Sequence, residues 1–165
     1  MKSPLPKRNH PRLKAYDYSQ NGCNFVTVCT DRRRELLCTV GRGDLTPPSV
    51  ELTPWGKIVE RYIRGMETAY PHITVEHYAI MPNHVHLLLT FSQPCGGVRS
   101  RRPTALPMVI RGWKGLITRE IGQSIWQTSF YEHIIRTQQE FEEIWQYIDE
   151  NPAAWAEDEY NLPQL

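Results

Sequence analysis

The sequence lacks any apolar run close to the ~20 residues that a membrane-spanning helix requires, so no transmembrane segment is predicted. The first residues, MKSPLPKRNHPRLK, are basic, but no hydrophobic stretch follows them, which argues against a secretory signal. Only four cysteines occur, and they form neither a CxxC pair nor a dense disulfide framework. These absences predict a cytoplasmic globular protein with no membrane partner.

The net charge is also small, at +1, but basic and acidic residues are distributed unevenly along the chain. Residues 1–14 and 99–119 are rich in lysine and arginine and contain no acid, whereas residues 132–159 hold nine carboxylates against the single Arg136. Such basic segments are typical of surfaces that bind phosphates. The length of 165 residues fits one domain, so we expect a basic arm over 1–20 and a single domain over 21–160.

Hydrophobic periodicity and turn residues predict alternating strands and helices. Helices are expected from Thr53, which can cap Pro54, from Thr104, and from Thr137, which forms a T-x-x-E capping box with Glu140. Strands are expected over 23–30, 73–80, 84–91 and 129–135, and a loop over 40–52. The order predicts an α+β fold: an antiparallel sheet with helices packed on it.

The periodicity also predicts which helical residues face inward. On the middle helix these are Met108, Val109, Trp113, Leu116 and Ile117. On the last helix they are Phe141, Ile144, Trp145 and Ile148.

His84 and His86 are the first candidate site residues. On a strand, residues two apart point to the same face, so both imidazoles project together while Val85 points to the core. Imidazole is a common metal ligand, and this spacing brings two of them to one ion. The pair is also compatible with a polar strand surface, and cupin-type sites use the same spacing, so it does not select one chemistry.

The last helix supplies a second pair, because Tyr147 and Asn151 are four apart and share one face on the flank of the apolar stripe. The phenol could pack with its hydroxyl in water, or it could act as a nucleophile with the Asn151 carboxamide reaching the same ion. Tyr131, in the strand 129–135, is the rival nucleophile. With a pKa near ~10, either phenol needs a metal that polarises the electrophile.

Several segments together resemble a known family: RLKAYDYS and FVTVCT near the start, HYAIMPNHVHLLL, IWQTSFYEHIIR, and WQYIDENP. They resemble the single-tyrosine HUH transposases, and most of all the REP-associated tyrosine transposases, over about residues 12 to 155. The loop 93–103 and the proline-rich residues before Arg12 depart from the family pattern.

The resemblance implies a ferredoxin-like or RRM-like fold, with His84, His86 and Asn151 as metal ligands and Tyr147 as the nucleophile. It implies cleavage and rejoining of single-stranded DNA next to REP-like hairpins, through a 5′-phosphotyrosine and with Mg²⁺ or Mn²⁺. The protein would be a monomer or a homodimer.

The residues expected to contact DNA combine cations with aromatic side chains. They are Arg12, Lys14, Tyr16, Arg99, Arg101, Arg102, Lys114, His133 and Arg136, with Tyr18 and Trp113 as further candidates for base stacking. Two alternatives stay open. The domain could bind hairpins without cleaving them, or it could be a different metalloenzyme that adds Glu76 and His77 to the histidine pair.

Overall fold

The computed structural model describes residues 22–41, 48–92 and 106–161. Its strands are β1 (Gly22–Cys29), β2 (Cys38–Val40), β3 (Val50–Leu52), β4 (Ile73–Met81), β5 (His84–Phe91) and β6 (Tyr131–Ile135). The α-helices are α1 (Pro54–Arg64), α2 (Met66–Ala69), α3 (Leu106–Ile121) and α4 (Gln138–Glu150). Short 3₁₀ turns are η1 (Asp31–Arg33), η2 (Trp155–Glu157) and η3 (Glu159–Asn161). Within the described segments, no helix has the length and apolar character needed to cross a membrane.

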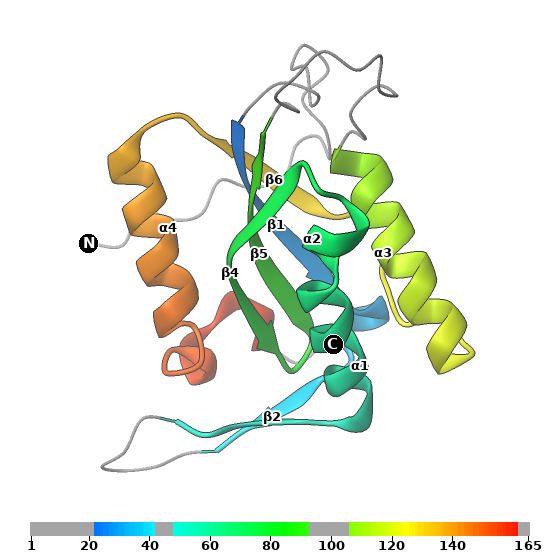
Figure 1. Ribbon diagram of the computed structural model, residues 1–165. Helices are drawn as coiled ribbons and strands as arrows, with labels where there is room; N and C mark the ends of the chain where they lie inside the picture. The colour runs from blue at the N-terminus through cyan, green and yellow to red at the C-terminus, as the bar shows by residue number, and fades with distance from the viewer. Residues whose placement is uncertain (1–21, 42–47, 93–105, 162–165) are drawn as a thin grey trace.

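The main sheet has four strands in the order β4-β5-β1-β6, and every neighbouring pair is antiparallel. Numbered along the chain without the β2–β3 ribbon, these strands run 2-3-1-4, which is the ferredoxin-like order. Figure 1 shows α1, α2 and α3 on one side of the sheet and α4 on the other. The predicted α+β class with helices on an antiparallel sheet is therefore confirmed.

The α1/α3 side of the sheet holds the larger core. Val26, Val28, Val85, Leu87 and Leu89 alternate along β1 and β5 and are fully buried against these helices. The buried residues of α3 are Leu106, Val109, Ile110, Trp113 and Ile117. The predicted inward face of α3 is wrong at Met108 and Leu116, which are 65% and 41% exposed, because the buried stripe runs through Leu106 and Ile110 instead.

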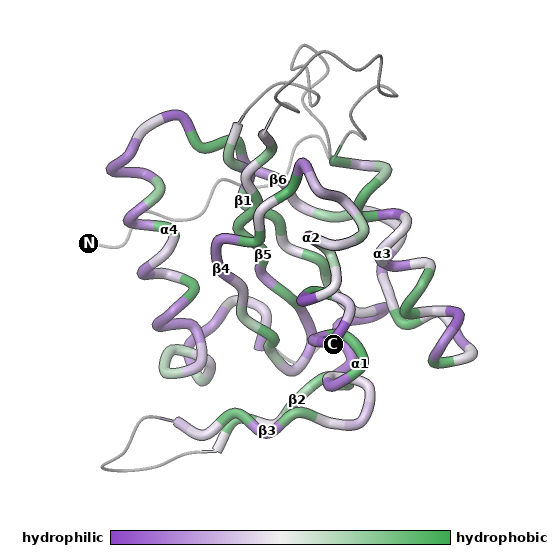
Figure 2. Tube along the Cα trace, in the orientation of Figure 1, coloured by the Kyte–Doolittle hydropathy of each residue, from purple (hydrophilic) through white to green (hydrophobic). Residues whose placement is uncertain are grey.

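The α4 side holds a smaller core, in which Phe25, Leu88 and Ile135 of the sheet meet Ile148. Hydrophilic and hydrophobic residues alternate along α4 (Figure 2), and only part of its apolar stripe is buried. Trp145 is 37% exposed and stacks on the His77 ring, so its predicted inward position is wrong.

The predicted loop over 40–52 is wrong at both ends, where Val40 and Val50 pair in the β2–β3 ribbon. The predicted start of α1 is confirmed, since the Thr53 side chain accepts a hydrogen bond from the Gly56 N–H at 3.0 Å. Gly56 also lets the helix approach β2, because a Cβ there would lie 1.9 Å from the Leu37 carbonyl oxygen.

Candidate functional site

The two histidines of β5 lie on the α4 side of the sheet, next to the turn that follows β4. His84 pairs with Cys29 of β1, and His86 pairs with Thr27. The exposed fractions of the two residues are 0% and 1%, while Val85 is buried on the opposite side. A polar strand surface, the simplest alternative for this pair, is therefore wrong.

The His84 ring is oriented by Asn83. The Asn83 amide donates from Nδ2 to the Tyr160 carbonyl oxygen at 2.6 Å, which leaves its Oδ1 as the acceptor 2.8 Å from His84 Nδ1. His84 Nδ1 therefore carries the proton, and the lone pair of the neutral ring is on Nε2. That Nε2 lies 3.1 Å from Nε2 of His86.

The His86 ring is oriented by Thr27, whose buried hydroxyl oxygen lies 2.8 Å from His86 Nδ1. A hydroxyl can donate or accept, so His86 can present either a proton or a lone pair at Nε2. Because His84 Nε2 carries a lone pair, His86 Nε2–H donates to it across the 3.1 Å contact. When His86 Nδ1–H donates to Thr27 instead, both Nε2 atoms carry lone pairs and lie 3.1 Å apart. Such outer hydrogen bonds are what metal-ligating histidines require.

Burial keeps both imidazoles neutral. It lowers the pKa of His86 to about 3 and the pKa of His84 well below its usual range, and the neighbouring His86 lowers the latter further. Arg33 also acts in this direction on His84, whereas the Asn151 carboxamide beside the ring favours the protonated form. Neutral imidazole is the form that coordinates metal ions.

Asn151 closes the C-terminal end of α4 and is 2% exposed. Its Nδ2 donates to Asp158 at 3.2 Å, which turns the carboxamide oxygen away from that carboxylate. Within the described chain this buried oxygen has no hydrogen-bond partner, since the adjacent neutral His84 offers a lone pair at Nε2 and no proton. A buried acceptor without a donor is costly, and a cation would satisfy it.

Two imidazole Nε2 atoms and one amide oxygen are donors of the kinds that a divalent ion can take. Among the residues that the structure describes, no group of three or more His, Cys, Asp or Glu side chains could hold a metal. The candidate set therefore depends on the amide oxygen of Asn151. Three ligands would leave open positions for substrate oxygens.

Tyr147 is half-buried on the inner flank of α4, and its ring centroid lies 5.3 Å from that of His86. The rival, Tyr131, pairs with Thr27, so it lies on the same side of the sheet as His86 but two strands away. Two strand spacings amount to roughly 10 Å. Helix α4 thus places Tyr147 next to the histidine pair, whereas Tyr131 on β6 lies farther from it.

The segment after α4 covers this site. The Tyr160 ring lies 4.5 Å from the His84 ring and 6.3 Å from the His86 ring, centroid to centroid, and Trp155 lies 6.0 Å from His84. The Arg33 guanidinium carbon lies over the Tyr160 ring, 4.9 Å from its centroid. Sequence patterns did not indicate Tyr160 or Arg33, because nothing in their spacing connects them with β5.

The residues expected to contact DNA are only partly described. Arg12, Lys14, Tyr16, Tyr18, Arg99, Arg101 and Arg102 lie outside the described residues. The Lys114 ammonium donates to the carbonyl oxygens of Gln127 and Thr128, at 2.5 and 3.3 Å. His133 Nε2 lies 2.5 Å from a Glu140 carboxylate oxygen, and Arg136 is exposed just before α4. Trp113 is 2% exposed in the core, so it cannot stack on bases.

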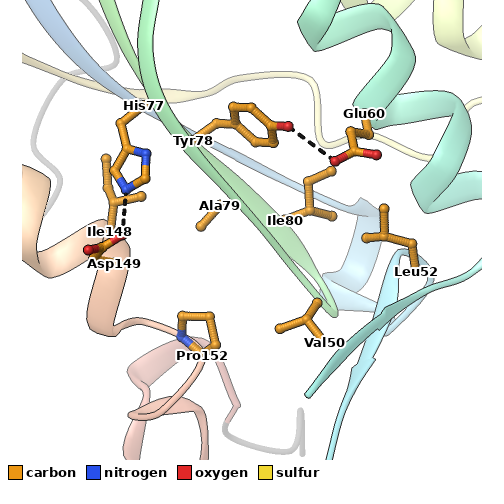
Figure 3. A pocket seen from close by; sticks show the side chains of 10 residues that line it. All are labelled: Val50, Leu52, Glu60, His77, Tyr78, Ala79, Ile80, Ile148, Asp149 and Pro152. Atoms are coloured by element: carbon orange, nitrogen blue, oxygen red, sulfur yellow. Dashed lines mark hydrogen bonds and ion pairs between the residues drawn. The ribbon is translucent and has the colours of Figure 1, made fainter. Parts of the chain in front are cut away.

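Of the alternative ligands Glu76 and His77, His77 lines a groove of ≈ 320 Å³ along β4 (Figure 3). Glu76 lies at a register shift of this strand. His77 Nε2 is hydrogen-bonded to Asp149 at 2.9 Å, and its ring stacks on Trp145 at 4.5 Å. His77 is thus engaged with α4, away from the histidine pair.

No family model matches the sequence. An uncharacterized protein of Haemophilus influenzae is 26% identical over 170 residues, which cover 92% of each chain. Among solved structures, a REP-associated tyrosine transposase bound to a REP hairpin superposes with a TM-score of 0.63 at 23% identity, over 87% of this chain and 74% of the other. The chain has the fold of a REP-associated tyrosine transposase. The resemblance read from the sequence is thereby confirmed at the level of the fold.

A second solved structure is a predicted transposase from Deinococcus radiodurans. It is 17% identical, with a TM-score of 0.49, over 84% of this chain and 95% of the other.

Proposed function

We propose that this protein is a REP-associated tyrosine transposase that cleaves and rejoins single-stranded DNA beside a hairpin. One observation carries the proposal: His84 Nε2 and His86 Nε2 lie 3.1 Å apart, the Asn151 carboxamide with its partnerless oxygen lies beside the His84 ring, and the Tyr147 ring centroid lies 5.3 Å from that of His86. The shared fold supports the same assignment. The hairpin enters as substrate because the REP-associated transposase of that fold was determined bound to a REP hairpin.

The two histidines and Asn151 would hold Mg²⁺ or Mn²⁺, which, when bound, polarises a non-bridging oxygen of the scissile phosphate. The Tyr147 hydroxyl attacks the phosphorus in line and loses its proton to solvent. The bond from phosphorus to the 3′ oxygen breaks, and that oxygen takes up a proton. The product is a 5′-phosphotyrosine with a free 3′-OH, and attack by a 3′-OH on this link restores the phosphodiester without a nucleotide cofactor.

The test is a covalent adduct. Wild-type protein incubated with hairpin-bearing single-stranded DNA and Mn²⁺ should give a protein–DNA band that survives a denaturing gel. Tyr147→Phe should abolish the band, while Tyr131→Phe, a matched loss of one hydroxyl, should keep it. A band that persists in Tyr147→Phe and disappears in Tyr131→Phe would reverse the assignment.

A non-cleaving hairpin-binding protein is the second candidate, and the buried state of the site favours it. His84 is fully buried beneath Tyr160, so a phosphate reaches the ring only when the segment 155–161 moves away. If that segment never moves, the fold binds DNA without cutting it. Specific binding without any adduct, across Mg²⁺ and Mn²⁺ and several hairpins, would select this candidate.

A further inference from the structure

The turn η1 and its C-cap residue Arg34 place three consecutive arginines, Arg32 to Arg34, beside the candidate metal site. It follows directly on the end of β1 that pairs with His84. Thr30 fastens the turn to Asn83, because its N–H donates to the Asn83 carbonyl oxygen at 2.9 Å, while its hydroxyl donates to the Arg34 carbonyl oxygen at 2.7 Å. The residue that orients His84 therefore also anchors the arginine turn.

Arg33 differs from its two neighbours in exposure and direction. It is half-buried over the Tyr160 ring, and Tyr160 in turn lies on the His84 ring. Arg32 and Arg34 are exposed, and Arg34 forms an ion pair with Asp31 at 3.6 Å. Of these three arginines, Arg33 lies against the aromatic ring that covers His84.

The backbone of the turn is strained where it directs these side chains. Arg32 and Arg33 have φ values of 52° and 50°, in the left-handed region that residues with a Cβ rarely adopt. Glycine would relieve this cost at either position. Strained non-glycine residues cluster at functional sites, where the surrounding structure maintains them for their side chains.

We propose that Arg33 binds a non-bridging oxygen of the phosphodiester that occupies the His84/His86 site, in the place now taken by the Tyr160 ring. The inference rests on the proposed function, which supplies the phosphodiester. A guanidinium matches two phosphate oxygens with two parallel N–H bonds. Opposite the ligand set, Arg33 would neutralise charge that develops on the equatorial oxygens as Tyr147 attacks.

The first readout is kinetic. Under single-turnover conditions with Mn²⁺, Arg33→Ala should slow adduct formation about 100-fold, the effect expected when one preorganised donor is lost. Arg33→Lys should recover part of the rate, since it keeps the charge and loses the fork. Arg32→Ala is the matched control, because it removes the same charge from an adjacent residue with the same backbone conformation, and should change the rate less than ~3-fold.

The second readout separates phosphate binding from support of Tyr160. Arg33→Ala is repeated in a Tyr160→Ala background. If Arg33 binds the phosphate, its rate effect persists when Tyr160 is absent. If Arg33 only holds the Tyr160 ring in place, its effect vanishes there, and the proposal is overturned.

The third readout does not depend on chemistry. In a Tyr147→Phe background with Mn²⁺, Arg33→Ala should weaken binding of the same DNA at least ~10-fold more than Arg32→Ala. If wild type forms adduct but Arg33→Ala matches Arg32→Ala in all readouts, the Arg33 assignment fails and the proposed function stands. If wild type forms no adduct, the proposed function fails. The difference in DNA affinity between Arg33→Ala and Arg32→Ala then decides by itself whether Arg33 binds the phosphate.

Discussion

At the residue scale, the site depends on hydrogen bonds that fix which ring nitrogen carries a proton. Asn83 fixes the tautomer of His84, because its amide oxygen accepts from the ring and its amide nitrogen is held by a backbone carbonyl. Thr27 holds the His86 ring through a hydroxyl that can either donate a hydrogen bond to Nδ1 or accept one from it. The spacing of the histidines predicted a shared ion, but these partners come from a turn and from another strand. Sequence spacing carries no information about such contacts.

We expect Thr27→Val to weaken Mn²⁺ binding by about 10- to 100-fold, the usual effect of removing an outer partner of a ligating histidine. Valine keeps the shape of the buried side chain and removes only the hydroxyl. Calorimetric titration with Mn²⁺ measures the change, and Thr90→Val, at the other end of β5, serves as control. Equal affinities in the two variants would contradict the role given to Thr27.

The depressed histidine pKa values predict that stability falls in acid. Folded His84 and His86 stay neutral while the unfolded chain takes up protons below its pKa of ~6.5, so stability present above that pH is lost as pH falls toward the folded value, about 3 for His86. At pH 5.5 the neutral His86 lowers the free energy of unfolding by about 1.4 kcal/mol, and His84 acts in the same direction.

Urea unfolding in metal-free buffer at pH 7.5 and 5.5 tests this. Comparison with His84→Gln and His86→Gln isolates the two imidazoles from other groups, such as Asp158, whose pKa is raised by burial. Both variants should depend less on pH than wild type, and His86→Gln should lose about 1.4 kcal/mol of the dependence. A pH dependence that is the same in wild type and both variants would refute the neutral buried pair.

At the scale of elements, caps and periodicity were sufficient to predict most of the secondary structure. Thr53 and Thr137 both accept the backbone hydrogen bonds expected of N-caps. The β2–β3 ribbon was missed because its strands are three residues each, too short for any alternation to register. The exposed Trp145 was placed inward because hydrophobicity alone does not reveal that His77 stacks on it.

Substitution of alanine for two helical glycines should change the free energy of unfolding in opposite directions. Gly56→Ala should destabilise the protein by about 2 kcal/mol or more despite the better helix propensity, because the new Cβ would lie 1.9 Å from the Leu37 carbonyl oxygen. Gly115→Ala in α3 should stabilise it by about 0.5–1 kcal/mol, since nothing lies within 4 Å of the new methyl. Chemical denaturation measures both, and equal signs would contradict the packing described for α1.

At the scale of the whole molecule, the strand order brings the distant parts of the site together. β5 supplies the histidines, β1 supplies Thr27, and α4 crosses the same face with Tyr147 and Asn151. The resemblance of short segments predicted this fold, which the structure shares with a REP-associated tyrosine transposase. The covering segment 155–161 could not be predicted, because its contacts with β5 are made across the fold and follow no periodic pattern.

The cover makes the histidines inaccessible to small reagents as well as to DNA. Diethyl pyrocarbonate should modify the part-exposed His77 and His133 readily and spare His84 and His86. Tyr160→Ala should expose both protected rings and raise their modification rate by at least ~10-fold, in line with the loss of a local opening step. Mass spectrometry of the peptides reads this directly, and rapid modification of His84 in wild type would show that the segment does not close the site.

Asn83 gives the cover a further consequence. Its amide is held in one orientation only while the Tyr160 carbonyl accepts from Nδ2. Departure of the C-terminal segment removes that anchor, so the amide is free to rotate and His84 loses its fixed proton acceptor. Access to the site and the geometry of His84 are therefore linked, because the movement that would admit a phosphate also loosens one of the two rings proposed to bind the ion.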